Sequence, residues 1–228
     1  AGSTVVHETG AWVSLAACLI VGPRMGRFDA AGRPIRITGH SPVLTAAGAL
    51  MLFVGWIGFN GGSTTSASPE VAHIIANTVL AGAAGGVGAY IAGWWTDGIV
   101  FPEKSICGML GGLVGVTAGC MVLDPLGAIQ IGLIGGIVAN WGNTFLETRF
   151  KIDDAVGAIG VHGFAGVAGT LGLALLAPME NLPLESRLDQ FSVQAIGAIV
   201  NFVWSFGAGL LVFWIIARFV PLRVSAQD

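Results

Sequence analysis

Three ionisable side chains interrupt long apolar stretches of this sequence, namely His7, Glu8 and His162. Imidazole titrates near neutral pH, and either of its ring nitrogens can donate or accept a proton, so two histidines held together can relay protons. Inserting an ionisable side chain into a bilayer costs about 2.5–3.5 kcal/mol on insertion scales, and such residues often mark a functional path. A lone histidine of this kind is more often a packing residue hydrogen-bonded to a neighbouring helix. The pair therefore matters chemically only if the two histidines act together.

The composition is that of a membrane protein. Asp, Glu, Lys and Arg make up 10% of the 228 residues, against about 25% in soluble domains, and 54% of the residues are hydrophobic. A net charge of −3 without a basic run argues against nucleic-acid binding. The sequence has no metal-ligand spacing, nucleophile elbow or phosphate loop, which argues against an enzyme, a metal site or a cofactor. Cys18, Cys107 and Cys120 show no close pairing and are expected to be small core residues.

Seven apolar stretches approach the length of about 20 residues that a transmembrane helix needs. They cover residues 3–22, 42–61, 71–95, 106–123, 126–146, 155–177 and 192–219. The fourth and fifth meet at Asp124-Pro125, where proline cannot continue a helix, so we expect a tight turn there. The sequence predicts an all-α polytopic membrane protein with seven transmembrane helices in one domain, residues 1–228. His40 and His73 fall in or near loops and are expected to be solvated or interfacial.

The basic residues predict an orientation. Nine of the ten would lie in loops on one side of the membrane: Arg24, Arg27, Arg33, Arg36, Lys104, Arg149, Lys151, Arg218 and Arg223. Arg187 alone falls on the other side. Because cytoplasmic loops are enriched in Lys and Arg, we expect the 23–41 loop and the C-terminus to lie in the cytoplasm, with the chain in the inner or plasma membrane.

Small residues recur at helical spacing within the predicted spans. Pairs of glycines four residues apart occur at Gly82/Gly86, Gly111/Gly115 and Gly132/Gly136. Glycine lets helix backbones approach closely in lipid. These pairs predict a tightly packed bundle and do not indicate a function.

The two histidines lie in similar segments. Val6-His7-Glu8-Thr9-Gly10-Ala11 resembles Val161-His162-Gly163-Phe164-Ala165-Gly166, and the predicted helices run in opposite directions. Weakly similar elements of opposite orientation are typical of an inverted repeat, whose functional site lies between the halves. If spans two to six form one five-helix repeat, span one is the last helix of the other repeat. Four further helices would then be expected before Ala1.

The segment from Gly55 to Ser63 (GWIGFNGGS) closes the second span on its predicted outer side. An interfacial aromatic belt followed by a glycine-rich turn would explain it equally well without further context. In the functional interpretation, aromatic faces and a hydroxyl at a pore mouth attract a small cation. Because the pore mouth carries no fixed negative charge, the cation is not trapped there. Trp56 and Phe59 are three residues apart and share a helix face, so both can line one pore.

These motifs resemble a known family. Val5-Val6-His7, the GWIGFNGGS segment, and Lys151 to Ala158 (KIDDAVGA) running into Val161-His162-Gly163 are similar to signatures of the ammonium transporter, methylammonium permease and Rhesus superfamily. The resemblance covers essentially the whole chain, from the fifth to the eleventh helix of that fold. It implies the last helix of one inverted repeat, the whole second repeat, and a final C-terminal helix.

The resemblance also implies roles for individual residues. His7 and His162 would be twin pore histidines, hydrogen-bonded to each other and acting as the proton relay. Trp56 would be a pore-lining aromatic, Phe59 one of two stacked gating phenylalanines, and Ser63 a hydroxyl at the outer ammonium recruitment site. In the implied mechanism, ammonium is recruited outside and deprotonated, and ammonia and the proton pass separately. Energetics agree, because burying the intact ion costs far more than burying neutral ammonia.

Asp153 and Asp154 stand at the cytoplasmic start of the sixth span, where the helix dipole favours carboxylates. A plain helix cap would explain both, although in the family this region also meets the C-terminal tail. A homotrimer and control by a PII-class nitrogen signalling protein are further family expectations.

Two departures from the family pattern leave a second function open. Glu8 is an acid where a small or neutral residue is expected, and could turn toward the four further helices, be protonated, or bind the cation more tightly. The GFNGGST segment, together with IVGPR after the first span, resembles the branch that is fused to signalling output domains. In that branch the fold can act as an ammonium sensor that binds without rapid conduction. A water or gas channel on another fold would leave the paired histidines and the Phe59-Asn60 motif unexplained.

Overall fold

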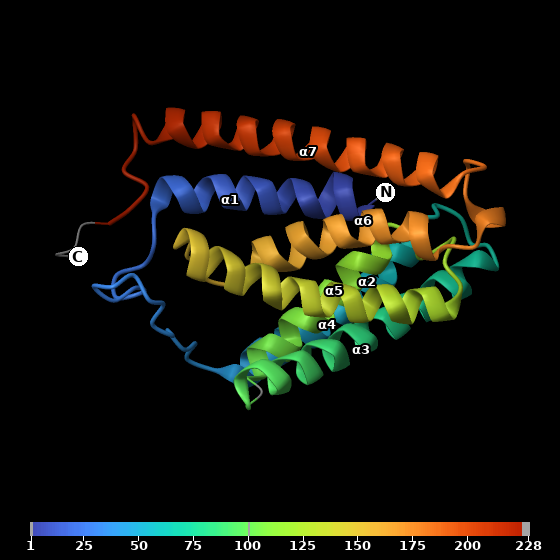
Figure 1. The fold of residues 1–228 in the computed structure, drawn as a ribbon, viewed down its shortest axis with the longest axis horizontal. Helices are drawn as coiled ribbons and strands as arrows, with labels where there is room; N and C mark the ends of the chain where they lie inside the picture. The colour runs from blue at the N-terminus through green and yellow to red at the C-terminus, as the bar shows by residue number, and fades with distance from the viewer. Residues whose placement is uncertain (1, 100, 225–228) are drawn as a thin grey trace.

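The fold is an all-helical bundle (Figure 1). The structure is a computed structural model that describes residues 2–99 and 101–224. Within these ranges the chain forms seven α-helices: α1 (Thr9–Val21), α2 (Pro42–Gly62), α3 (Glu70–Asp97), α4 (Pro102–Thr117), α5 (Pro125–Phe145), α6 (Ala165–Leu176) and α7 (Arg187–Ile216). Four short helical segments adjoin them: η1 (Ser3–Glu8), η2 (Leu146–Phe150), η3 (Ile159–Phe164) and η4 (Met179–Asn181). The predicted helix number is confirmed for the described residues.

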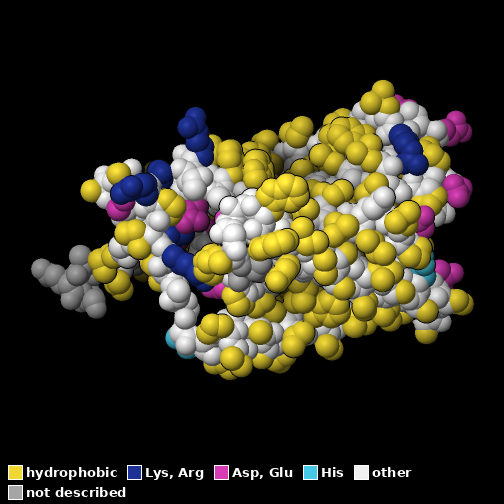
Figure 2. All heavy atoms as spheres, turned by 60° about the horizontal axis from the view of Figure 1, so that its bottom comes forward, with side chains coloured by type: hydrophobic (Ala, Val, Ile, Leu, Met, Phe, Trp, Pro, Cys, Tyr) yellow, Lys and Arg dark blue, Asp and Glu magenta, His cyan; other side chains and the backbone are white. Residues whose placement is uncertain are grey.

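Six helical segments are long and apolar enough to cross a bilayer. They are Ser3–Val21, Pro42–Gly62, Glu70–Asp97, Pro125–Phe150, Ile159–Leu176 and Arg187–Ile216. The exception is α4, which has 16 residues. Hydrophobic side chains cover most of the face shown in Figure 2, as expected for a surface in contact with lipid or with other apolar helices.

The fourth predicted span is misplaced. It was expected to continue to residue 123, but α4 ends at Thr117. Asn77 of α3 explains the difference, because its side-chain amide donates to the carbonyls of Cys120 and Leu123 at 3.0 and 2.8 Å and holds them outside a regular helix. His73 contacts the Leu123 carbonyl at 2.8 Å and is exposed, as expected for a solvated or interfacial residue.

The predicted turn at Asp124-Pro125 is confirmed. α5 begins at Pro125, and the Asp124 carboxylate accepts a hydrogen bond from Gly127 N at 2.6 Å. The start of the sixth span differs from the prediction, since the helix begins at Ile159 rather than at 155. Gly157, at φ +74°, lies in the loop that precedes this helix, and a Cβ there would lie 2.6 Å from the Asn143 side-chain nitrogen.

The centre of the bundle is the contact of α3, α4 and α5, where the backbones nearly touch. A Cβ atom at Gly136 would lie 2.1 Å from the carbonyl oxygen of Gly85, and one at Gly112 would lie 2.3 Å from that of Ala81. Both positions therefore require glycine. The expected close packing is confirmed here. Gly86 is an exception, because a Cβ atom at this position would have no neighbour closer than 3.6 Å.

α1 and α6 run in opposite directions (Figure 1). The end of α1 and the start of the sixth helix meet where Arg24 binds the Asp153 carboxylate at 2.8 Å. Arg36 binds Glu103 at 2.6 Å, and Arg27 pairs with Glu147, so the 23–41 loop, the start of α4 and the end of α5 share this end of the molecule. We call it the Arg24 end. Figure 2 shows most Lys and Arg side chains gathered at one end.

Replacing Gly136 tests the α3–α5 contact. Gly136→Ala should lower the free energy of unfolding by about 1–3 kcal/mol, the usual cost of overpacking, because the new methyl group meets backbone atoms that cannot rotate away. Thermal unfolding in detergent, followed by circular dichroism, measures this. Gly197→Ala on α7 is the control, since a Cβ there has no neighbour within 4 Å. Equal melting temperatures for the two variants would contradict the packing.

Candidate functional site

Each pore-histidine candidate lies in a π-helical turn. His7 belongs to η1, which leads into α1, and His162 belongs to η3, which leads into α6. A π-helical turn is rare, costs regular hydrogen bonding and occurs often at functional sites. The two segments that resemble each other in sequence thus share an unusual backbone, and the antiparallel helices bring both histidines to one place.

The rings of the two histidines face each other. Their centroids are 5.2 Å apart, with ring planes at 21°. The expected hydrogen bond between them is not formed in the part of the chain that the structure describes. Nε2 of His7 and Nδ1 of His162 are buried without a protein hydrogen-bond partner. Two ring nitrogens are therefore left free for a ligand or for water.

Two aromatic side chains of α2 complete the cluster. The Trp56 indole stacks on His7 with centroids 4.9 Å apart, and its plane lies within 4° of the His162 plane. The Phe59 ring meets His7 edge-on at 5.7 Å. Trp56 Nε1 donates to the Thr117 hydroxyl at 3.0 Å, which in turn donates to the Leu113 carbonyl at 2.7 Å. This chain of hydrogen bonds fixes the indole against the imidazoles.

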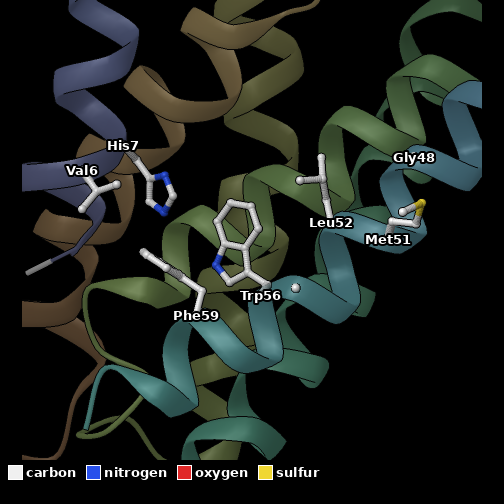
Figure 3. A pocket seen from close by; sticks show the side chains of 8 residues that line it. Val6, His7, Gly48, Met51, Leu52, Trp56 and Phe59 are labelled. Atoms are coloured by element: carbon white, nitrogen blue, oxygen red, sulfur yellow. The ribbon is translucent and has the colours of Figure 1, made fainter. Parts of the chain in front are cut away.

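A cavity of about 560 Å³ opens beside this cluster (Figure 3). It is lined by Val6, His7, Gly48, Met51, Leu52, Gly55, Trp56 and Phe59. In Figure 3 the His7 ring points toward Trp56 and Phe59 across the space between η1 and α2. His7 is the only ionisable residue of this lining, so the cavity suits a small polar molecule better than a fully hydrated ion.

Ser63 lies away from the histidines, at the end of α2 opposite the Arg24 end. Its hydroxyl donates to the Phe59 carbonyl at 2.6 Å, and the residue is exposed. The neighbouring Asn60 side chain donates to the Thr78 hydroxyl at 3.0 Å and ties this end of α2 to α3. Ser63 is therefore accessible from outside the bundle, whereas Phe59 stands between it and His7.

Glu8 points away from the cavity. Its side chain is fully buried between η1 and α6, where Oε1 accepts hydrogen bonds from the hydroxyls of Thr4 at 3.2 Å and Thr170 at 3.4 Å. The two hydroxyl oxygens lie 2.7 Å apart, so when one hydroxyl donates to the other, only one of the two donates to Oε1. Sequence reasoning missed both threonines. The four-residue spacing of Thr4 and Glu8 was a local signal, but nothing in the sequence pointed to Thr170.

The two aspartates before η3 have different roles. Asp154 Oδ2 accepts a hydrogen bond from Ile159 N at 2.6 Å and so caps the start of the helix. Asp153 instead receives the guanidinium of Arg24 at 2.8 Å and that of Arg27 at 3.2 Å. Hydrogen bonds from Arg24 hold the pKa of the Asp153 carboxyl at about 2, below its ordinary value. Asp153 therefore joins the loop after the His7 helix to the start of the His162 helix.

Comparison with known proteins decides the family. The sequence model described as Ammonium Transporter Family matches residues 1–228. The chain belongs to the ammonium transporter family. Ammonium transporter Amt2 of Archaeoglobus fulgidus is 40% identical to it over 240 aligned residues, which cover 100% of this chain and 51% of that protein.

Solved structures show the same fold. A protein described as "Sensor Amt Protein" matches with a TM-score of 0.96 at 41% identity, over 99% of this chain and 56% of its own. Mep2 of Candida albicans matches with a TM-score of 0.87 at 26% identity, over 100% of this chain and 52% of its own. The chain thus spans about half the length of each of these proteins. Membership of this family agrees with a multi-pass membrane protein that is not an enzyme.

The Asp153 ion pair should contribute measurably to stability. Asp153→Asn should lower the free energy of unfolding by on the order of 2 kcal/mol at neutral pH, because the carboxyl is 2% exposed and its pKa is about 2 against an ordinary 3.8. A depressed pKa stabilises the folded state above the unfolded-state pKa. The difference from wild type should therefore vanish as the pH falls from about 4 to about 2, in chemical or thermal unfolding.

Asp29→Asn is the control for this experiment, since the Asp29–Arg33 pair is local and its arginine is 80% exposed. An Asp153→Asn variant as stable as Asp29→Asn at neutral pH would contradict the assignment.

Proposed function

We propose that this chain forms the pore-bearing half of an ammonium transporter. Ammonium would be recruited at the outer face near Ser63, lose its proton near Phe59 and Trp56, and continue as ammonia past His7 and His162. The observation that carries this proposal is the apolar cavity lined by the His7 imidazole and by the Trp56 and Phe59 rings, with the His162 ring centred 5.2 Å from that of His7.

The physical argument is the cost of burying charge. An ammonium ion in an apolar cavity would lose its hydration shell without a countercharge, whereas ammonia loses only the hydrogen bonds of a polar group. The free ring nitrogens of His7 and His162 can accept or donate one of those bonds, and either imidazole can carry the released proton onward.

Orientation and assembly belong to the same proposal. The basic residues of the Arg24 end would face the cytoplasm, with the C-terminus on the same side and Ser63 outside. The Arg223 guanidinium, which donates to the Val21 carbonyl at 3.2 Å, is consistent with a C-terminal segment at this end. A homotrimer in a cell membrane, controlled by a PII-class protein or a fused signalling domain, would complete the assembly.

A second candidate function is ammonium sensing. It is favoured by the likeness to the protein described as a sensor Amt, which shares 41% of its aligned residues with this chain at a TM-score of 0.96. In this case the same cavity would bind ammonium without passing it rapidly, and the bound state would be signalled to another domain.

Replacing the second histidine tests the proposal. In proteoliposomes, an ammonium jump should drive a current through the full-length protein, and His162→Ala should reduce it at least tenfold, a typical loss when a proton-transfer group is removed. His40→Ala is the matched control, because His40 is exposed in the 23–41 loop.

The same preparation separates the two functions. Ammonium binding in calorimetry without any ammonium-dependent current would exclude transport and support the sensor. If the wild-type protein showed neither ammonium binding nor an ammonium-dependent current, both functions would be excluded.

A further inference from the structure

Thr117, the last residue of α4, contacts both elements that enclose the cavity without lining it. Its hydroxyl accepts a hydrogen bond from Trp56 Nε1 of α2 at 3.0 Å and donates to the Leu113 carbonyl at 2.7 Å. Its methyl group reaches the start of η1, where a Cβ atom at Gly2 would lie 2.7 Å from Thr117 Cγ2. One side chain therefore contacts α2 and the start of η1, between which the cavity opens.

The hydrogen bond matters because of where the indole nitrogen lies. Trp56 is buried and lines the cavity, and in Figure 3 the nitrogen-bearing edge of its ring is on the side of His7 and Phe59. The centroids of those two rings are 4.9 and 5.9 Å from that of Trp56. Among the residues that line the cavity, Trp56 and His7 alone carry a side-chain nitrogen. Without Thr117, the indole N–H would be a second polar group available at the cavity wall.

The number of free polar groups decides whether water can stay in such a cavity. A buried water molecule needs about two to four polar partners. While Thr117 holds the indole N–H, Nε2 of His7 is the one unpaired nitrogen among the described lining residues. A free indole N–H beside the imidazole would raise the number of partners to two. Ammonia is less demanding than water, because it has one lone pair to satisfy instead of two and its N–H groups are weaker donors than O–H groups.

We propose that Thr117 is a specificity-determining residue. By accepting the hydrogen bond of the Trp56 indole it removes one donor from the cavity, so that the wall can pass ammonia but cannot hold water. This inference rests on the proposed function, since it concerns which small neutral molecule follows the path past His7. Thr117 itself takes no part in proton transfer, because its single hydroxyl proton is donated to the Leu113 carbonyl.

Removing the hydroxyl should make the indole N–H available to water. Thr117→Val keeps the branched shape of the side chain and its contact with Gly2, but it removes the acceptor. The Trp56 N–H is then left unpaired beside the cavity, which costs free energy unless water enters and binds it. Thr117→Ser keeps the hydroxyl and should behave as wild type.

The osmotic water permeability of proteoliposomes that contain the full-length protein tests this. In stopped-flow light scattering, the protein-dependent permeability of Thr117→Val should exceed that of wild type at least about fivefold, the order expected when a buried donor gains a partner. Thr148→Val is the matched control. The Thr148 hydroxyl also donates to a carbonyl one turn earlier, that of Thr144 at 2.7 Å, but it binds no side chain among the described residues.

A double variant separates this role from a merely structural one. Trp56→Phe removes the indole N–H, so adding Thr117→Val to Trp56→Phe should not change the water permeability further. Hydrogen–deuterium exchange of the Trp56 indole, assigned by the loss of its NMR signal in Trp56→Phe, gives a second measurement. The indole proton should exchange slowly in wild type and Thr117→Ser, and fast in Thr117→Val.

Two results would overturn the inference. One is equal water permeability in Thr117→Val and wild type, and the other is an equal rise caused by Thr117→Val in the presence and absence of the Trp56 indole. Neither result bears on the ammonium current, so the proposed function would stand. If wild-type protein neither binds ammonium nor carries current, the proposed function fails instead, and the permeability and exchange measurements still decide whether Thr117 shields the indole from water.

Discussion

The cost of placing polar groups in an apolar bundle governs the arrangement of this chain. Several buried polar side chains bond to a nearby backbone carbonyl, and others form one cluster around His7 and His162. Asn77 and Ser3 illustrate the first arrangement, since the side chain of each donates hydrogen bonds to backbone carbonyls of a neighbouring segment. Nε2 of His7, Nδ1 of His162 and Oε2 of Glu8 are three of the seven buried side-chain atoms that have no hydrogen-bond partner among the described residues. Unsatisfied atoms gathered in one region indicate where a ligand or a proton would be held.

Two devices hold that cluster in place. The π-helical turns η1 and η3 turn the imidazoles toward each other from antiparallel helices, and the Asp153 ion pairs with Arg24 and Arg27 tie those same helices together at one end. The glycine contacts of α3, α4 and α5 supply a rigid support, because backbones this close cannot slide past one another without a clash. Thr117 then links the support to the site by fixing the Trp56 indole.

The sequence was sufficient to predict the apolar segments, their antiparallel order and the pairing of His7 with His162, because hydrophobic length and repeated motifs are local properties. It could not predict the early end of α4, which depends on hydrogen bonds from the Asn77 amide to backbone carbonyls more than 40 residues away in the chain. The contact of Glu8 with Thr170 spans 162 residues and left no pattern in the chain. Similarly, the assignment of Asp153 as a helix cap overlooked the arginines that approach it only in the fold.

The central claim is that the cavity between η1 and α2 is part of a pore for ammonium. The most direct test is a high-resolution structure of the full-length protein with ammonium. The account predicts that the cavity persists in the complete protein as a narrow passage, with a bound molecule between Phe59 and the ring nitrogens of His7 and His162. A cavity filled by side chains from the rest of the protein, with ammonium bound elsewhere, would contradict it.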